Sequence, residues 1–113
     1  MGKVGIVILN YNNTIEIREC IESILKYTPL DKIRCVVVDN GSAATKREII
    51  HSYLESKFNH SYRRVNKGER CDTLEDMTYL CIPQNLGYAC GNNEGIDFLQ
   101  HFDLISHIMI LNS

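Results

Sequence analysis

The sequence predicts an α/β protein with an open, doubly wound and mostly parallel sheet that carries helices on both faces. Two observations lead to this fold class. Four apolar runs lack polar alternation, as expected of strands buried on both faces. The segments between them are long enough for right-handed crossover helices, which parallel strands require. With 113 residues, of which 44% are apolar, the chain can form one compact domain.

The first strand is predicted over residues 4–9, and polar residues follow it. Apolar residues at helical spacing come next, and Asn13 with Glu16 fits a capping box at the start of that helix. Pro29 ends the helix because proline cannot continue the backbone hydrogen bonding. This segment therefore forms the first strand–helix unit.

The second unit repeats this order. Residues 35–38 form an apolar strand that ends at turn-forming residues 39–42. Thr45 with Glu48 fits a second capping box, so the next helix is expected to start there.

The remaining chain adds two strands and one helix. Residues 59–77 are polar with balanced charges and are interpreted as a surface excursion. Residues 78–82 form a strand that ends at Pro83, and a glycine- and asparagine-rich stretch leads into the third helix. Residues 107–111 form the last buried strand.

Polar residues follow the carboxyl end of each predicted strand. In doubly wound sheets ligands bind beyond these ends. We therefore expect these polar residues to converge on one crevice: Asn10, Tyr11, Asn12, Asp39, Asn40, Asn85, Gly87, Asn112 and Ser113.

Composition and charge argue against several classes of protein. The net charge is −2 and the basic residues are dispersed, so no nucleic-acid partner is expected. Five cysteines without a CxxC pair and four histidines without ligand spacing predict a reducing compartment and no structural zinc. The first apolar run is too short for a signal peptide or a membrane span. We expect a cytoplasmic protein, with peripheral membrane association of a longer parent protein left open.

Motifs of other nucleotide-binding and hydrolytic classes are missing. The first strand leads into Asn10, not into a GxGxxG fingerprint or a GxxxxGK phosphate loop, and no serine lies in a GxSxG elbow. Receiver domains need an acidic pair after the first strand, where this chain has Asn10 and Asn12. Nucleotidyltransferases carry a glycine-rich loop with a basic residue there, which is also absent.

Two residues at the strand ends have both a ligand-binding and a structural interpretation. Asp39 ends an apolar strand, and its carboxylate either accepts the imide N–H of a uracil or thymine ring or caps the following turn. Tyr11 either stacks on a base or packs against the core. The residue pattern alone leaves these alternatives open.

Four segments taken together, 6–12, 36–42, 85–96 and 110–113, resemble the family 2 glycosyltransferases of the GT-A fold. The resemblance implies that residues 1–113 are the N-terminal, nucleotide-sugar-binding part of an incomplete, Rossmann-like GT-A domain. It implies sugar transfer from a UDP-, dTDP- or GDP-sugar donor to a hydroxyl of a saccharide, lipid or other acceptor. Inversion and a divalent ion, Mg or Mn, are implied as well.

By position, the resemblance assigns nucleotide-binding roles to Leu9, Asn10, Tyr11, Asp39, Asn40, Asn85 and Gly87. The first three would line the base pocket, and Asp39 would accept the imide N–H of the base. Asn85 and Gly87 would shape the wall near ribose and phosphate. Gly91 and Asn93 are assigned a structural role in starting the next helix.

The resemblance also places Asn112 and Ser113 directly before the family's metal-binding Asp, which this sequence does not include. The catalytic base would lie beyond residue 113, so no catalytic residue is assigned, and the 113-residue chain alone is expected to transfer no sugar. The strand 107–111 would have an outer edge without a partner and apolar side chains on both faces, so we expect the chain to pair or aggregate through this edge, or to be unstable. The alternative function is a non-catalytic nucleotide-binding domain of the same fold.

Overall fold

The structure is a computed structural model that describes residues 2–112. Its centre is a sheet of five parallel strands in the order β3-β4-β2-β1-β5. The strands span Lys3–Asn10 (β1), Ile33–Asn40 (β2), Tyr62–Asn66 (β3), Met77–Ile82 (β4) and Ile105–Asn112 (β5). The predicted parallel sheet is therefore confirmed, with one strand more than the sequence indicated.

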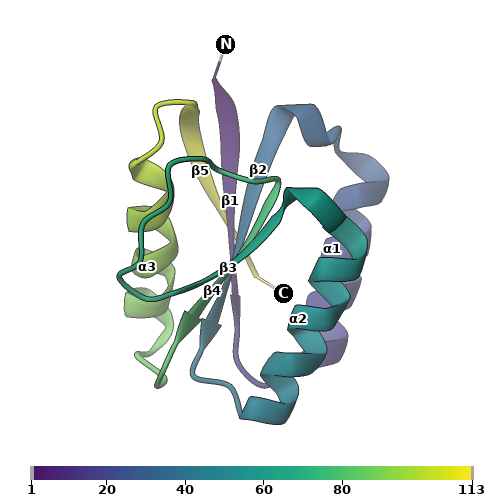
Figure 1. The fold of residues 1–113 in the computed structure, drawn as a ribbon, viewed down its shortest axis with the longest axis vertical. Coiled ribbons are helices and arrows are strands. Elements are labelled where there is room, and N and C mark those ends of the chain that lie inside the picture. Colours follow the sequence, from purple (N-terminus) through teal and green to yellow (C-terminus); the bar gives the residue numbers. More distant parts are fainter. Residues whose placement is uncertain (1, 113) are drawn as a thin grey trace.

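Helices cover both faces of the sheet, as Figure 1 shows. α1 (Thr14–Tyr27) and α2 (Ala44–Phe58) lie on one face and α3 (Tyr88–Gln100) on the other. Short 3-10 turns at Leu30–Lys32 and Asn59–Ser61 precede β2 and β3. In the part of the chain that the structure describes, no helix is long and apolar enough to cross a membrane.

Alternating side chains along the central strands divide the core into two layers. Ile8 of β1 and Val37 of β2 lie in the layer under α1 and α2, whereas Val7 and Val38 lie in the layer under α3. All four side chains are completely buried. Burial on both faces explains why β1 and β2 are apolar without alternation.

The two helices on the first face begin differently. α1 begins as predicted, because the Oδ1 atom of its N-cap Asn13 accepts the backbone N–H of Glu16 at 3.0 Å. The predicted capping box at Thr45 is wrong, since α2 begins one residue earlier and its N-cap, Ala43, makes no side-chain cap. The side chain of Asn12 instead accepts the Ala43 N–H at 2.8 Å. A neighbouring loop thus replaces the local cap.

The polar segment 59–77 is not entirely a surface loop, because it contains β3. This strand pairs in parallel with β4 and forms one edge of the sheet. Within β3 only Val65 is buried, and Arg63 is exposed. Charged residues are typical of edge strands. They also conceal the apolar pattern by which the other strands are detected, which is why the sequence did not predict β3.

Two glycines allow α3 to lie close to the sheet. A Cβ atom at Gly95 would be 2.7 Å from Val7 and 2.8 Å from Val38, and one at Gly91 would be 2.7 Å from Leu9. These distances are well below the roughly 3.5–4.0 Å of favourable carbon–carbon contact. The glycines of the glycine- and asparagine-rich stretch therefore serve the contact between α3 and the ends of β1 and β2.

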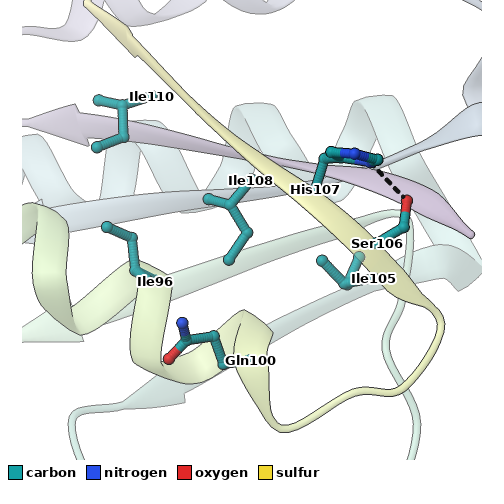
Figure 2. Close-up of a pocket in the computed structure, with 7 residues that line it drawn as sticks. All are labelled: Ile96, Gln100, Ile105, Ser106, His107, Ile108 and Ile110. Atoms are coloured by element: carbon teal, nitrogen blue, oxygen red, sulfur yellow. Dashed lines mark hydrogen bonds between the residues drawn. The ribbon is translucent and has the colours of Figure 1, made fainter.

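β5 forms the other edge of the sheet, beside β1. Its side chains Met109 and Ile110 point to opposite faces and are 50% and 42% exposed. A hollow of about 400 Å³ lies between this strand and α3. Figure 2 shows the residues that line it, four of which are isoleucines: Ile96, Gln100, Ile105, Ser106, His107, Ile108 and Ile110.

Candidate functional site

The polar residues predicted at the strand ends converge at one end of the sheet, where the parallel strands have their carboxyl ends. β4, β2 and β1 are parallel neighbours, so the loops that follow them, 83–87, 41–43 and 11–13, lie side by side. Hydrogen bonds join these loops to one another and to the strands and helix behind them. The loop network, as we call it, consists of Asn12, Asp39, Asn40, Ser42, Arg47, Tyr79 and Asn85.

Asp39 accepts three hydrogen bonds at the end of β2, and its side chain is 0% exposed. Its Oδ1 atom accepts the hydroxyl of Tyr79 at 3.0 Å, and Oδ2 accepts the backbone N–H of Ser42 at 3.0 Å and the Nε–H of Arg47 at 3.2 Å. Burial, and then the Asp39 carboxylate, raises the pKa of Tyr79, so its hydroxyl stays a donor. The turn-capping role of Asp39 is therefore observed, and its ligand role stays a prediction.

Arg47 holds the network together, although no sequence pattern identified it. Its Nη2 atom donates to the backbone oxygens of Ser42 at 3.2 Å and Ile82 at 3.3 Å, while Nε donates to Asp39. One side chain from the first turn of α2 thus contacts the ends of β2 and β4. Tyr79 was missed for a related reason, because in the sequence it looks like any apolar strand residue.

The loops after β1 and β2 are locked by reciprocal hydrogen bonds. The backbone N–H of Asn12 donates to the hydroxyl oxygen of Ser42 at 2.8 Å, and the Asn12 side chain accepts the Ala43 N–H. Asn12 has a positive φ of 54°, which asparagine tolerates better than most residues. The conformation of the first loop therefore depends on the second.

Asn40 locks the loop after β4. Its Nδ2 atom donates to Asn85 Oδ1 at 3.1 Å and to the Gly87 oxygen at 3.2 Å, and its Oδ1 accepts the Leu86 N–H at 2.9 Å. Gly41 follows with a φ of 82°, and a Cβ there would lie 2.4 Å from the Asn85 nitrogen. The structure therefore brings together the predicted residues of β2 and of the glycine-rich stretch.

The end of β1 supplies the remaining predicted residues. Leu9 is half-buried under α3, and Tyr11 is 52% exposed, so its ring is not a core residue. Asn10 is 1% exposed, and neither polar atom of its amide has a hydrogen-bond partner. It is the register partner of Asp39, so the two side chains are neighbours on the face under α1 and α2. A buried polar group left unpaired costs roughly 1–3 kcal/mol.

A cavity of about 370 Å³ opens next to the loop network at the carboxyl ends of β3 and β4. It is lined by Arg47, Asn66, Lys67, Cys81 and Pro83. Arg47 thus faces the buried Asp39 on one side and this cavity on the other, with 22% of its side chain exposed.

The predicted metal-site residues lie at the limit of the structure. Asn112 pairs with Leu9 through the backbone of β5, but its side chain is not described, and Ser113 lies outside the described residues. Within residues 2–112, no three His, Cys, Asp or Glu side chains are placed to hold a metal ion. These residues alone therefore do not fit a metal site.

Comparison with known protein families agrees with this architecture. The family model described as Glycosyl transferase family 2 matches residues 5–101. The chain belongs to glycosyl transferase family 2. The family match includes the loops after β1, β2 and β4 and nearly reaches β5. A search of curated proteins found no significant match.

Membership of glycosyl transferase family 2 confirms the resemblance seen in the sequence. It supports glycosyltransferase activity in general, and with it the binding of a nucleotide sugar and an acceptor in general. The loop network lies entirely inside the matched segment and at the sheet edge where ligands of doubly wound folds bind.

Proposed function

We propose that residues at the strand ends, held in place by the loop network, bind the nucleotide of a UDP-, dTDP- or GDP-sugar donor, and that the sugar is transferred with inversion to a hydroxyl of a saccharide or lipid acceptor. These residues are Leu9, Asn10, Tyr11, Asp39, Asn40, Asn85 and Gly87. The observation that carries this proposal is the buried, unpartnered amide of Asn10 beside the carboxylate of Asp39. Buried polar groups in proteins nearly always have partners. A bound nucleotide base supplies the partners that Asn10 lacks.

The chemistry of the two side chains suits such a base. The Asn10 amide offers donors and an acceptor, whereas the ionised carboxylate of Asp39 only accepts. Uracil, thymine and guanine each present a ring N–H next to a carbonyl oxygen, which matches an acceptor beside a donor. Three donors already occupy Asp39, and a carboxylate has about four acceptor positions. The base takes the remaining position once the residues that cover Asp39 move on binding.

Tyr11 and the loop after β4 complete the proposed donor site. The exposed ring of Tyr11 can stack on a base at the cost of little reorganisation. Asn85 and Gly87, fixed by Asn40, form the wall for ribose and phosphate. We also propose a divalent ion, Mg or Mn, as a cofactor that would supply positive charge for the diphosphate, although residues 2–112 offer no group of three His, Cys, Asp or Glu side chains to hold it.

Calorimetric titration with UDP, dTDP and GDP, each with and without Mn, tests the proposal. Wild-type protein should bind at least one of them, and Asn10→Leu should abolish this binding. Because Asn10→Leu removes an unpaired buried amide, it should leave the free energy of unfolding equal or higher. A variant that is as stable as wild type and binds nucleotide equally well would exclude Asn10 from the site.

A further inference from the structure

We propose that Arg47 is a positioning residue for base selectivity: it fixes the carboxylate of Asp39 in one place without touching the ligand. This inference rests on the proposed function, because it concerns how Asp39 recognises a base. No family motif in the sequence points to Arg47, and the inference follows from its contacts alone.

The contacts of Arg47 determine where the end of β2 lies. Its guanidinium group donates to the Asp39 carboxylate at 3.2 Å and to the backbone oxygens of Ser42 and Ile82 at 3.2 and 3.3 Å. A guanidinium group is planar and rigid, so these three acceptors are held at fixed relative positions. The carboxylate is thereby tied to the turn behind it and to β4 beside it.

Arg47 also compensates the charge of Asp39. The Asp39 side chain is 0% exposed, and a buried charge is retained only when it is paired and hydrogen-bonded. Tyr79 and the Ser42 N–H contribute neutral donors, while Arg47 contributes the positive charge. Without that charge, the carboxylate would be left buried with neutral donors alone, and it would move toward solvent. Such a movement would displace its acceptor positions from the base.

This preference is what separates nucleotide bases. An ionised carboxylate accepts the ring N–H of uracil but repels the ring nitrogen lone pair that cytosine presents at the same position. A site with the Asp39 carboxylate fixed in place therefore prefers UDP to CDP. A displaced Asp39 loses this discrimination, even where stacking on Tyr11 is unchanged.

Arg34 provides a matched control at the opposite end of β2. Its side chain is 18% exposed, close to the 22% of Arg47, and it pairs with Asp76 at 3.4 Å. It also donates to three backbone oxygens, those of Leu30, Ile33 and Leu74. Removing Arg34 therefore deletes the same kinds of contact without reaching the loop network.

The test compares Arg47→Ala, Arg47→Lys and Arg34→Ala by calorimetric titration with UDP and CDP, and by urea unfolding. Both alanine variants should be less stable than wild type. Only Arg47→Ala should lower the UDP-to-CDP affinity ratio, by about tenfold, the value of one hydrogen bond to a charged group. Arg47→Lys keeps the positive charge without the planar guanidinium group and should recover part of the UDP-to-CDP affinity ratio. This variant also tests the inference if Arg47→Ala does not fold.

The outcomes separate this inference from the proposed function. If wild type prefers UDP and Arg47→Ala keeps the wild-type ratio, the inference is overturned and the proposed function stands. If wild type binds none of UDP, dTDP and GDP, the proposed function fails, and selectivity through Arg47 fails with it. If wild type binds dTDP or GDP but does not prefer UDP to CDP, the proposed function stands and the inference fails. A double-mutant cycle with Asp39→Asn adds an independent check on stability. Additive losses would show that Arg47 does not act through Asp39.

Discussion

Replacing Tyr79 by phenylalanine measures how strongly the buried carboxylate of Asp39 depends on its donors. The substitution removes one hydroxyl and leaves a completely buried ring in place. The lost hydrogen bond joins the hydroxyl to Asp39 Oδ1 at 3.0 Å, in a site with no access to water. A hydrogen bond to a charged group contributes about 1.5–3 kcal/mol, and water cannot replace it here.

The expected change is large enough to measure by thermal or urea unfolding. The unfolding entropy of 113 residues is about 0.24 kcal/mol/K, so a loss of 1.5–3 kcal/mol lowers Tm by roughly 6–12 °C. Tyr62→Phe is the matched control. Its hydroxyl lies 2.8 Å from the ring nitrogen Nδ1 of His51 in a partly buried position. That neutral hydrogen bond contributes only about 0.5–1.5 kcal/mol.

The comparison between the two variants shows whether the Tyr79 hydroxyl stabilises the Asp39 carboxylate. If Tyr79→Phe costs no more than Tyr62→Phe, the Asp39 carboxylate is not stabilised by the hydroxyl. The loop network would then have to be held by Arg47 and backbone groups alone.

Three further predictions concern the core, the pH dependence and the β5 edge. Gly95→Ala should lower the free energy of unfolding in urea by about 1–2 kcal/mol, because the added Cβ would collide with Val7 and Val38. This loss should exceed the gain from the better helix propensity of alanine. A variant more stable than wild type would contradict the close packing of α3. Burial raises the pKa of the Cys35 thiol from 9.0 to about 12, so the folded state holds this proton more tightly and stability should fall as pH rises from 9 to 12. Cys35→Ala should flatten that fall in urea unfolding, and an unchanged slope would refute the assignment. Ile110→Lys places a charge on the exposed side of β5 and should suppress self-association through this edge strand, as measured by sedimentation velocity. A wild-type protein that stays monomeric at high concentration would refute the predicted self-association.

The sequence predicted β1, β2 and β4, which are buried on both faces, because their apolar runs depend only on burial. The prediction that residues 107–111 form a buried strand is wrong, since β5 is an edge strand whose described side chains are half-buried or exposed. The sequence missed β3, since a charged edge strand with one buried residue, Val65, has no apolar run. The sequence placed Asn10, Asp39, Asn40 and Asn85 together, because the carboxyl ends of parallel strands all lie at the same end of the sheet.

The contacts within the site could not be predicted in the same way. Two of the three partners of Asp39, Arg47 and Tyr79, come from α2 and β4, and their choice depends on side-chain conformations that no local pattern encodes. Arg47 looks like an ordinary surface residue of a helix, and the missing partners of Asn10 become visible only when its surroundings are known. Topology thus follows from the sequence pattern, whereas the electrostatics of the site require the packed structure.

The loop network has a consequence for folding. Its hydrogen bonds join residues that are far apart in the chain: 30 residues for Asn12 and Ser42, 40 for Asp39 and Tyr79, and 45 for Asn40 and Asn85. The strands that carry the network are equally distant in the chain, since Asn10 pairs with Asp39 and Asp39 pairs with Cys81. The network therefore shares the loop-closure cost of the sheet, and no part of it is local enough to form by itself. Competence to hold a donor is thus a property of the assembled sheet and would be lost with any opening that detaches β4.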